Sequence, residues 1–139
     1  ILLQMVCIYE FTILILDDEE VIREAFSAYF EDRLWITIKA ESAEGALDLL
    51  EKKSPDAAVV DIRLPGMSGG EFIGEALLLK PKMVFVICTG SPEYIVPVEL
   101  RGEERVSKYI FKKPLTKLFD LESELLQLIA GIEKEKQEK

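Results

Sequence analysis

The chain has 139 residues, of which 49% are hydrophobic and 31% charged, and this composition is typical of one globular domain with its own core. Its 26 acidic and 17 basic residues give a net charge of −9, which argues against a nucleic-acid-binding surface because such a surface needs clustered lysines and arginines. The sequence contains no histidine, which excludes a phosphohistidine, a histidine-containing zinc site and a Ser–His–Asp triad.

The start of the sequence, its end and its two cysteines set the expected domain bounds and compartment. The apolar N-terminal stretch is too short for a membrane span and lacks the pattern of a signal peptide, so we expect no membrane attachment. We interpret residues 1–10 as a cloning remnant or a piece of preceding sequence, residues 11–132 as one domain, and residues 133–139 as a charged tail that frays. Cys7 and Cys88 lack metal-ligand spacing, which favours a reduced, buried Cys88 and a cytoplasmic location.

Apolar runs alternate with amphipathic stretches in the first part of the chain. Thr12–Leu16 is a continuous apolar run, typical of a strand covered on both faces, and an apolar helical face follows over residues 19–30. Residues 35–40 alternate between apolar and polar side chains, which predicts an edge strand with one wetter face. Ser42 then has the position of an N-cap for a helix that continues to about Lys53.

Two more buried strands are predicted in the middle of the chain, at Ala57–Val60 and over residues 83–88. Between them, Ser68 and Glu71 have the spacing of a capping box, which predicts a helix that continues to about Leu79.

The last third of the chain is predicted to hold a helix, a strand and a longer helix. Ser91, Pro92 and Glu93 have the order of a helix cap, a first-turn proline and an acidic first turn, although the apolar pattern behind them is weak. Residues 109–112 predict a short final strand. A closing helix is expected from about residue 116, with the apolar stripe Leu118, Leu121, Leu125, Leu128 and Ile132.

Strands that alternate with helices in this way predict an α/β fold with a doubly wound, five-stranded parallel sheet. The three apolar strands require interior positions and the two mixed strands require edges, which the flavodoxin-like order 2-1-3-4-5 satisfies. In this order the carboxyl ends of the first and third strands lie side by side at the switch point, where such sheets bind ligands.

Acidic residues follow both of these strands. Asp17, Asp18 and Glu19 follow the first strand and Asp61 follows the third, so three aspartates are expected to meet in one crevice. Two unit charges about 5 Å apart repel by about 3 kcal/mol at an effective dielectric of about 20, which a cation would relieve. Acids at the start of a helix also stabilise it, but Asp61 has no capping role. Oxygen-only donors favour Mg²⁺, and we expect Asp18 to contribute more than Glu19, whose side chain should point to solvent.

The fourth and fifth strands bring a hydroxyl and an ammonium to the same edge of the sheet. Thr89 follows the fourth strand and Lys113 follows the fifth. Beside three aspartates, these two groups are what the oxygens of an added phosphoryl group would need. Each residue alone is weak evidence, but all of them fall at successive strand ends.

The sequence resembles response-regulator receiver domains over about residues 11–132. The resemblance rests on Asp-Asp-Glu after ILIL, DIRLPGMSG, Thr-Gly after FVIC, and Lys-Lys-Pro-Leu near the end. It implies a flavodoxin-like receiver fold in which Asp61 is the phosphoacceptor. It further implies that Asp18, Asp61 and the backbone carbonyl of Arg63 bind Mg²⁺, with Asp17 supporting the metal through water.

The resemblance also implies a switch and its partners. Thr89 would supply the switch hydroxyl, Lys113 would pair with the phosphate, and Lys113-Pro114 would be a cis peptide. The function expected is a phosphorylation-dependent switch of a two-component phosphorelay, which takes its phosphoryl group from a sensor histidine kinase or a phosphotransfer protein. Such a domain catalyses only its own phosphotransfer and dephosphorylation. Its signal would leave through an output domain or a homodimer at the face of the fourth and fifth strands.

Several departures and alternatives stay open. Ile110 occupies the position of the family's usual aromatic switch, and Tyr109 could replace it only if an irregularity in the strand turns it to that face. The side chain of Arg63 could reach either a phosphoryl group or solvent. A degenerate receiver that acts as a constitutive interaction module is the main alternative, although such domains usually lose an acid or the lysine. A Mg²⁺ phosphohydrolase and an FMN-binding flavodoxin lack their expected motifs.

Overall fold

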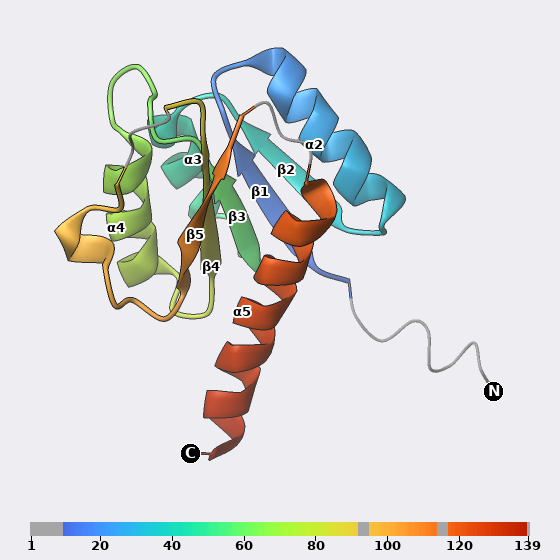
Figure 1. Cartoon of the computed structure of the whole chain (residues 1–139), viewed down its shortest axis with the longest axis vertical. Coiled ribbons are helices and arrows are strands. Elements are labelled where there is room, and N and C mark those ends of the chain that lie inside the picture. Colours follow the sequence, from blue (N-terminus) through green and yellow to red (C-terminus); the bar gives the residue numbers. More distant parts are fainter. Residues whose placement is uncertain (1–9, 92–94, 114–116, 139) are drawn as a thin grey trace.

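The computed structural model describes residues 10–91, 95–113 and 117–138. Five parallel strands form one sheet in the order β2-β1-β3-β4-β5, as predicted. Figure 1 shows this sheet between two layers of helices. The strands are β1 (Thr12–Leu16), β2 (Ile36–Ala40), β3 (Ala57–Val60), β4 (Val84–Thr89) and β5 (Val106–Lys112).

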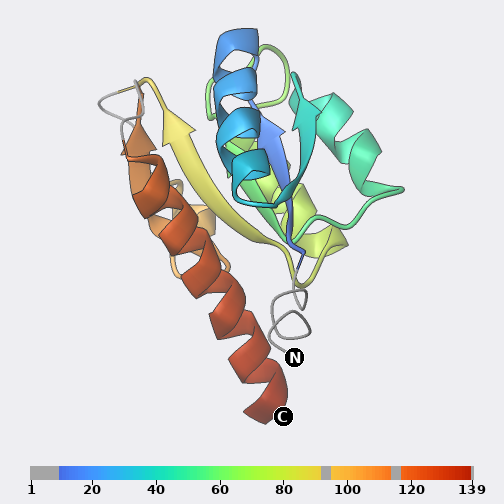
Figure 2. The same ribbon diagram turned by 90° about the vertical axis from the view of Figure 1, so that its right-hand side faces the viewer.

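The helices divide between the two faces of the sheet (Figures 1 and 2). Two of them, α2 and α5, pack on one face, while α3 and α4 pack on the other. Their bounds are α2 (Glu20–Asp32), α3 (Ala43–Leu50), α4 (Gly69–Leu79) and α5 (Leu118–Glu138).

The alternation of side chains along each strand produces two separate apolar clusters. In β1, Ile13 and Ile15 pack towards α2 and α5, whereas Leu14 and Leu16 pack towards α3 and α4. All four of these side chains are almost completely buried. The continuous apolar runs therefore do form strands that are covered on both faces, as predicted.

Local signals place the starts of two helices. The Ser42 hydroxyl accepts a hydrogen bond from the Gly45 N–H at the start of α3. Ser68 and Glu71 form the predicted capping box of α4. Gly69 follows this cap, and a Cβ atom there would lie 2.0 Å from the carbonyl oxygen of Asp61, so only glycine lets α4 begin this close to β3.

The helix expected after Ser91 is not found in the described residues. Residues 92–94 lie outside them, and residues 95–105 contain only a 3-10 turn, η1 (Val98–Leu100). Pro97 has ψ 146° and has no N–H, and a proline also biases the residue before it away from helical geometry. This prediction was wrong for the described residues, where the segment between β4 and β5 is irregular apart from η1.

The edge strand β5 begins earlier than predicted and contains an irregularity. Phe85 pairs with Val106, but Ile87 pairs with Ile110, so β5 has two extra residues over this interval. Because the excess is even, Val106 and Ile110 pack in the same cluster. Tyr109 is 61% exposed and borders a cleft with residues of α5 instead, so the irregularity does not turn it to the face of Ile110.

The helix α5 is longer than the apolar stripe that predicted it. It continues to Glu138, so the segment expected to fray is helical as far as that residue. Figure 2 shows its last turns extending past the end of the sheet. Among the described helices, none is both long and apolar enough to cross a membrane.

Candidate functional site

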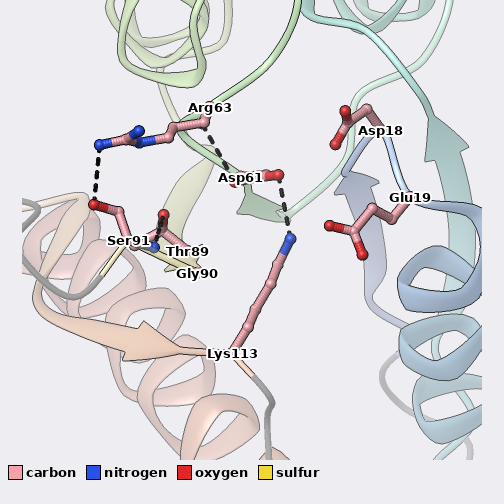
Figure 3. Close-up of a pocket in the computed structure, with 8 residues that line it drawn as sticks. All are labelled: Asp18, Glu19, Asp61, Arg63, Thr89, Gly90, Ser91 and Lys113. Atoms are coloured by element: carbon pink, nitrogen blue, oxygen red, sulfur yellow. Dashed lines mark hydrogen bonds and ion pairs between the residues drawn. The ribbon is translucent and has the colours of Figure 1, made fainter.

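The carboxyl ends of the strands surround a pocket of about 530 Å³ (Figure 3). Its lining consists of Asp18, Glu19, Asp61, Arg63, Thr89, Gly90, Ser91 and Lys113. These residues come from the end of β4 and from the loops that follow β1, β3, β4 and β5, as the parallel topology requires. The structure therefore brings together the aspartates, hydroxyl and ammonium that the sequence placed at this edge.

Asp61 is buried at the base of the pocket, with only 5% of its surface exposed. Its Oδ2 lies 3.2 Å from Lys113 Nζ, and its Oδ1 accepts a hydrogen bond of 3.3 Å from the Arg63 N–H. Burial raises the pKa of Asp61 above its usual value. The Lys113 charge opposes this rise and the Asp17 charge adds to it, but burial prevails.

Asp17 lies beside Asp61 and has partners for both of its oxygens. Oδ2 forms an ion pair of 2.6 Å with Lys113 Nζ, and Oδ1 accepts from the Glu19 N–H at 2.9 Å. The ammonium thus joins two buried carboxylates. Burial alone would lower the pKa of Lys113, but the hydrogen bond and charge of Asp17, followed by those of Asp61, raise it above its usual value.

An acidic cluster lies at the end of β1. Asp17, Asp18 and Glu19 each offer one carboxylate oxygen, and these oxygens lie within 4.8 Å of one another. The carboxylates of Asp18 and Glu19 are exposed and point towards the pocket in Figure 3. The oxygen-only donor set, with one buried acid and two exposed ones, suits a hard cation such as Mg²⁺.

Glu19 is exposed to solvent, as expected, but its side chain also borders the pocket. It is the N-cap of α2 and has extended backbone angles, φ −92° and ψ 118°, so it belongs to the loop rather than to the first helical turn. Its carboxylate therefore lines the pocket with Asp18. Glu19 directly follows the Asp-Asp pair, and this adjacency is the sequence signal that could have identified it.

Thr89 is fully buried at the end of β4. Its Oγ1 accepts a hydrogen bond of 3.1 Å from the Ser91 N–H, and its carbonyl accepts from the Lys113 N–H at 3.0 Å. The hydroxyl keeps its own proton available as a donor towards the pocket it lines.

Ser91 has a role in the site that the sequence did not indicate. Its Oγ accepts from Arg63 Nη2 at 3.2 Å, and its carbonyl accepts from Lys112 Nζ at 2.8 Å. The guanidinium of Arg63 therefore reaches across the pocket to the loop after β4 (Figure 3). The part of the backbone carbonyl of Arg63 as a metal ligand stays a prediction.

Cys88 lies beneath this site in β4 and is a free, buried thiol, as predicted. Burial raises its pKa to about 12. The Lys113 charge opposes this rise, while Asp17 and Asp61 add to it. Cys88 is thus protonated at neutral pH. Cys7 lies outside the described residues.

The fold and the acidic pocket define the class of an α/β domain with a ligand site at the switch point. Comparison with protein families identifies the class more closely, because residues 13–121 match the response regulator receiver domain. The chain belongs to this family and is a receiver domain of two-component signalling.

Curated relatives place the same domain in proteins of different activity. A cyclic di-GMP phosphodiesterase of Thermotoga maritima is 37% identical over 78 residues, which cover 56% of this chain and 21% of the relative. Sporulation initiation phosphotransferase F of Bacillus subtilis is 31% identical over 81 residues, which cover 58% of this chain and 65% of the relative. The chain thus spans less than two thirds of the length of either relative.

Solved structures share the architecture over most of this chain. A CheY-like receiver domain protein from Methanospirillum hungatei is 26% identical, with a TM-score of 0.77, and the match covers 91% of this chain and 99% of that one. The response regulator TrrA from Thermotoga maritima, in complex with Mg(2+)-BeF, is 25% identical, with a TM-score of 0.73 and coverage of 85% and 98%.

Proposed function

We propose that this domain is a Mg²⁺-dependent switch that accepts a phosphoryl group on Asp61 from a sensor histidine kinase or a phosphotransfer protein. The observation that carries the proposal is the geometry of Asp61, a buried carboxylate that opens into a pocket and lies 3.2 Å from Lys113 Nζ. The structure of the relative TrrA with Mg(2+)-BeF supports the choice of ligand.

The reaction needs little beyond a positioned carboxylate. An oxygen of Asp61 attacks the phosphorus of a phosphohistidine, an acyl phosphate forms, and the P–N bond breaks. The imidazole nitrogen of the donor leaves with the electron pair and takes up a proton. Bound Mg²⁺ would neutralise charge on the phosphoryl oxygens, which is its usual contribution to such transfers.

The residues divide between the metal and the phosphoryl group. Asp18, Asp61 and the backbone carbonyl of Arg63 would hold Mg²⁺, and Asp17 would support it through water. The Asp17 ion pair with Lys113 is 2.6 Å long, so Asp17 also holds the ammonium next to Asp61. A fourth acid, Glu19, borders the same pocket and adds to its negative potential.

Thr89 and Lys113 would convert the new charge into a change of shape. Lys113 Nζ would pair with a phosphoryl oxygen, and the Thr89 hydroxyl would donate to another. The hydroxyl oxygen presently accepts from the Ser91 N–H, so any movement of Thr89 would also move the loop after β4. The signal would leave through the face of β4 and β5, to an output domain or to a second copy of the domain.

The domain would act as a regulatory phosphoacceptor that catalyses only its own phosphotransfer and dephosphorylation. The alternative, a degenerate receiver that serves as a constitutive interaction module, is disfavoured by the contact of Lys113 with both Asp17 and Asp61. The cytoplasmic location stays a prediction.

Incubation with acetyl phosphate and Mg²⁺, followed by intact-mass measurement, tests the proposal. We expect one phosphoryl adduct on the parent protein, none on Asp61→Asn, and none on the parent when EDTA removes the metal. Asp48→Asn is the matched control, because Asp48 is an exposed aspartate on α3 away from the pocket, and it should leave the adduct intact. An unmodified parent at saturating donor would favour the constitutive module, and an adduct on Asp61→Asn would show that the phosphoacceptor is another residue.

A further inference from the structure

The loop between β3 and α4, residues 61–68, carries Arg63 and is held by a contact near each of its ends. Its start is held by the Asp61 carboxylate, which accepts from the Arg63 N–H at 3.3 Å. Its end is held by an acid of another element, because Glu44 Oε2 accepts from the Met67 N–H at 3.1 Å. Glu44 lies in the first turn of α3 and does not line the pocket.

Gly66 makes room for this contact. It has φ +79°, and a Cβ atom there would lie 2.7 Å from Glu44 Oε2, so the carboxylate occupies space that a side chain would otherwise fill. The Met67 N–H binds one carboxylate oxygen of Glu44, and the absence of a side chain at Gly66 leaves space for that oxygen. The hydrogen bond from Met67 also lowers the pKa of Glu44, so the acid is ionised at neutral pH.

An acid in the first turn of a helix has a simpler role, because it interacts favourably with the helix dipole. That role needs no particular partner outside the helix. Here the carboxylate reaches a backbone amide 23 residues away in the sequence, on the loop that follows the phosphoacceptor. Because of this hydrogen bond, Glu44 differs from an acid that only stabilises α3.

We propose that Glu44 is a positioning residue, which holds the loop after β3 in the conformation that presents Arg63 to the metal and phosphoryl group. The inference rests on the proposed function, since it assigns to Glu44 an effect on Mg²⁺ binding and phosphorylation at Asp61. Glu44 would act through the Met67 amide, since it does not line the pocket itself.

The test compares three variants by three measurements. Glu44→Ala removes the acceptor, Glu44→Gln keeps an oxygen acceptor but removes the charge, and Asp48→Ala removes an equal charge one turn later on the same helix. Amide hydrogen exchange at Met67 reports the contact itself. Mg²⁺ titration followed by NMR, and the rate of phosphorylation by acetyl phosphate, report its effect on the site.

For Glu44→Ala we expect faster exchange at Met67 and a Mg²⁺ dissociation constant raised about 3- to 10-fold, the size of one net hydrogen bond. Phosphorylation at subsaturating Mg²⁺ should slow by a similar factor and recover at saturating Mg²⁺. Glu44→Gln should remain close to the parent in all three measurements, and Asp48→Ala should be equal to the parent. Urea unfolding of each variant confirms that the folded fraction is unchanged.

The outcomes distinguish the positioning role of Glu44 from the proposed function of Asp61. If the parent binds Mg²⁺ and is phosphorylated, and Glu44→Ala does both equally well, the positioning role is refuted while the function of Asp61 stands. If Glu44→Gln is as impaired as Glu44→Ala, the charge of Glu44 matters and the contact with Met67 does not. A parent that neither binds Mg²⁺ nor accepts a phosphoryl group would refute the proposed function and this inference with it.

Discussion

Glu122 and Asp61 are both buried carboxylates that join distant parts of the chain, but they differ in how completely their charges are paired. Glu122 is 4% exposed and Asp61 is 5% exposed, so burial alone does not distinguish them. Glu122 lies on α5 and contacts residues at the end of α2 and in the turn before β2. Asp61 lies at the carboxyl edge of the sheet.

Both carboxylate oxygens of Glu122 have partners. Its two oxygens accept from Trp35 Nε1 at 2.9 Å and from the Tyr29 hydroxyl at 3.1 Å, and Arg33 Nε forms an ion pair with it at 2.7 Å. The Arg33 guanidinium also lies over the rings of Tyr29 and Phe119, 5.7 Å from each centroid. Burial, followed by the bond and charge of Glu122, raises the pKa of Tyr29.

Asp61, in contrast, shares one ammonium with Asp17 and borders a pocket. Burial outweighs the effect of Lys113 and raises the pKa of Asp61. A buried carboxylate that is fully paired stabilises the fold, whereas one that is partly paired and open to a pocket can gain stability from a ligand. The two clusters should therefore respond in opposite ways when their acid is removed.

The largest effect on stability is expected for Glu122→Ala. It would leave the Trp35 N–H without its acceptor and Arg33 without its counter-ion, so we expect the free energy of unfolding to fall by about 2–4 kcal/mol. Chemical denaturation measures this change, with the exposed Glu133→Ala on the same helix as the control. Phosphorylation of the folded fraction should be retained. A loss below about 0.5 kcal/mol would mean that this cluster does not join α5 to the rest of the domain.

Asp61→Asn should have a smaller effect of the opposite sign. The pKa of Asp61 is raised in the folded state above its unfolded value of 3.8, so the folded state holds its proton more tightly. Stability is therefore lost as the pH rises from about 3.8 through the raised pKa of the folded state.

The asparagine variant removes this ionisation and should melt a few degrees higher than the parent at pH 7 in EDTA. The difference should shrink as the pH falls towards 4, and thermal melts at several pH values measure it. Saturating Mg²⁺ should reverse the order by stabilising the parent more. A parent that is the more stable of the two at pH 7 without Mg²⁺ would mean that Asp61 is as well paired as Glu122.

The cluster of Asp17, Asp61 and Lys113, which is open to the pocket, could be predicted from the sequence. The closed cluster around Glu122 could not. Parallel strands bring their carboxyl ends to one edge, so Asp17, Asp61 and Lys113 could be placed together from the strand pattern alone. Glu122 meets Tyr29 and Trp35 across 93 and 87 residues, through side-chain hydrogen bonds from α5 to α2 and to the residue before β2. No local pattern encodes such a contact.

The same division applies to the elements. The capping box at Ser68 and the apolar run of β1 are local signals, and they predicted the start of α4 and a central strand. The weak pattern after Ser91 predicted a helix where the described residues have only η1. The irregularity of β5 arises from its pairing with β4, and the contact of Glu44 with Met67 arises from the packing of α3 beside the loop.

The smallest effect is expected beside the closed cluster, at Leu34. Among the described residues Leu34 is the only non-glycine with a positive φ, 69°, and it is 81% exposed. It follows the C-cap of α2, where the Trp35 N–H donates to the Phe30 carbonyl at 2.9 Å, a pattern that favours glycine at the residue between. The left-handed conformation is strained for leucine, and the exposed side chain buries little surface in return.

Leu34→Gly should therefore raise the free energy of unfolding by about 0.5–1 kcal/mol, the part of the strain left after the entropy that glycine loses on folding. Leu34→Ala keeps the Cβ atom and should show no such gain, which separates backbone strain from the loss of a side chain. Urea unfolding of both variants measures the difference, and phosphorylation should be equal in both. If glycine destabilises the domain, the leucine side chain supports the neighbouring Arg33 and Trp35, and the closed cluster extends to the surface.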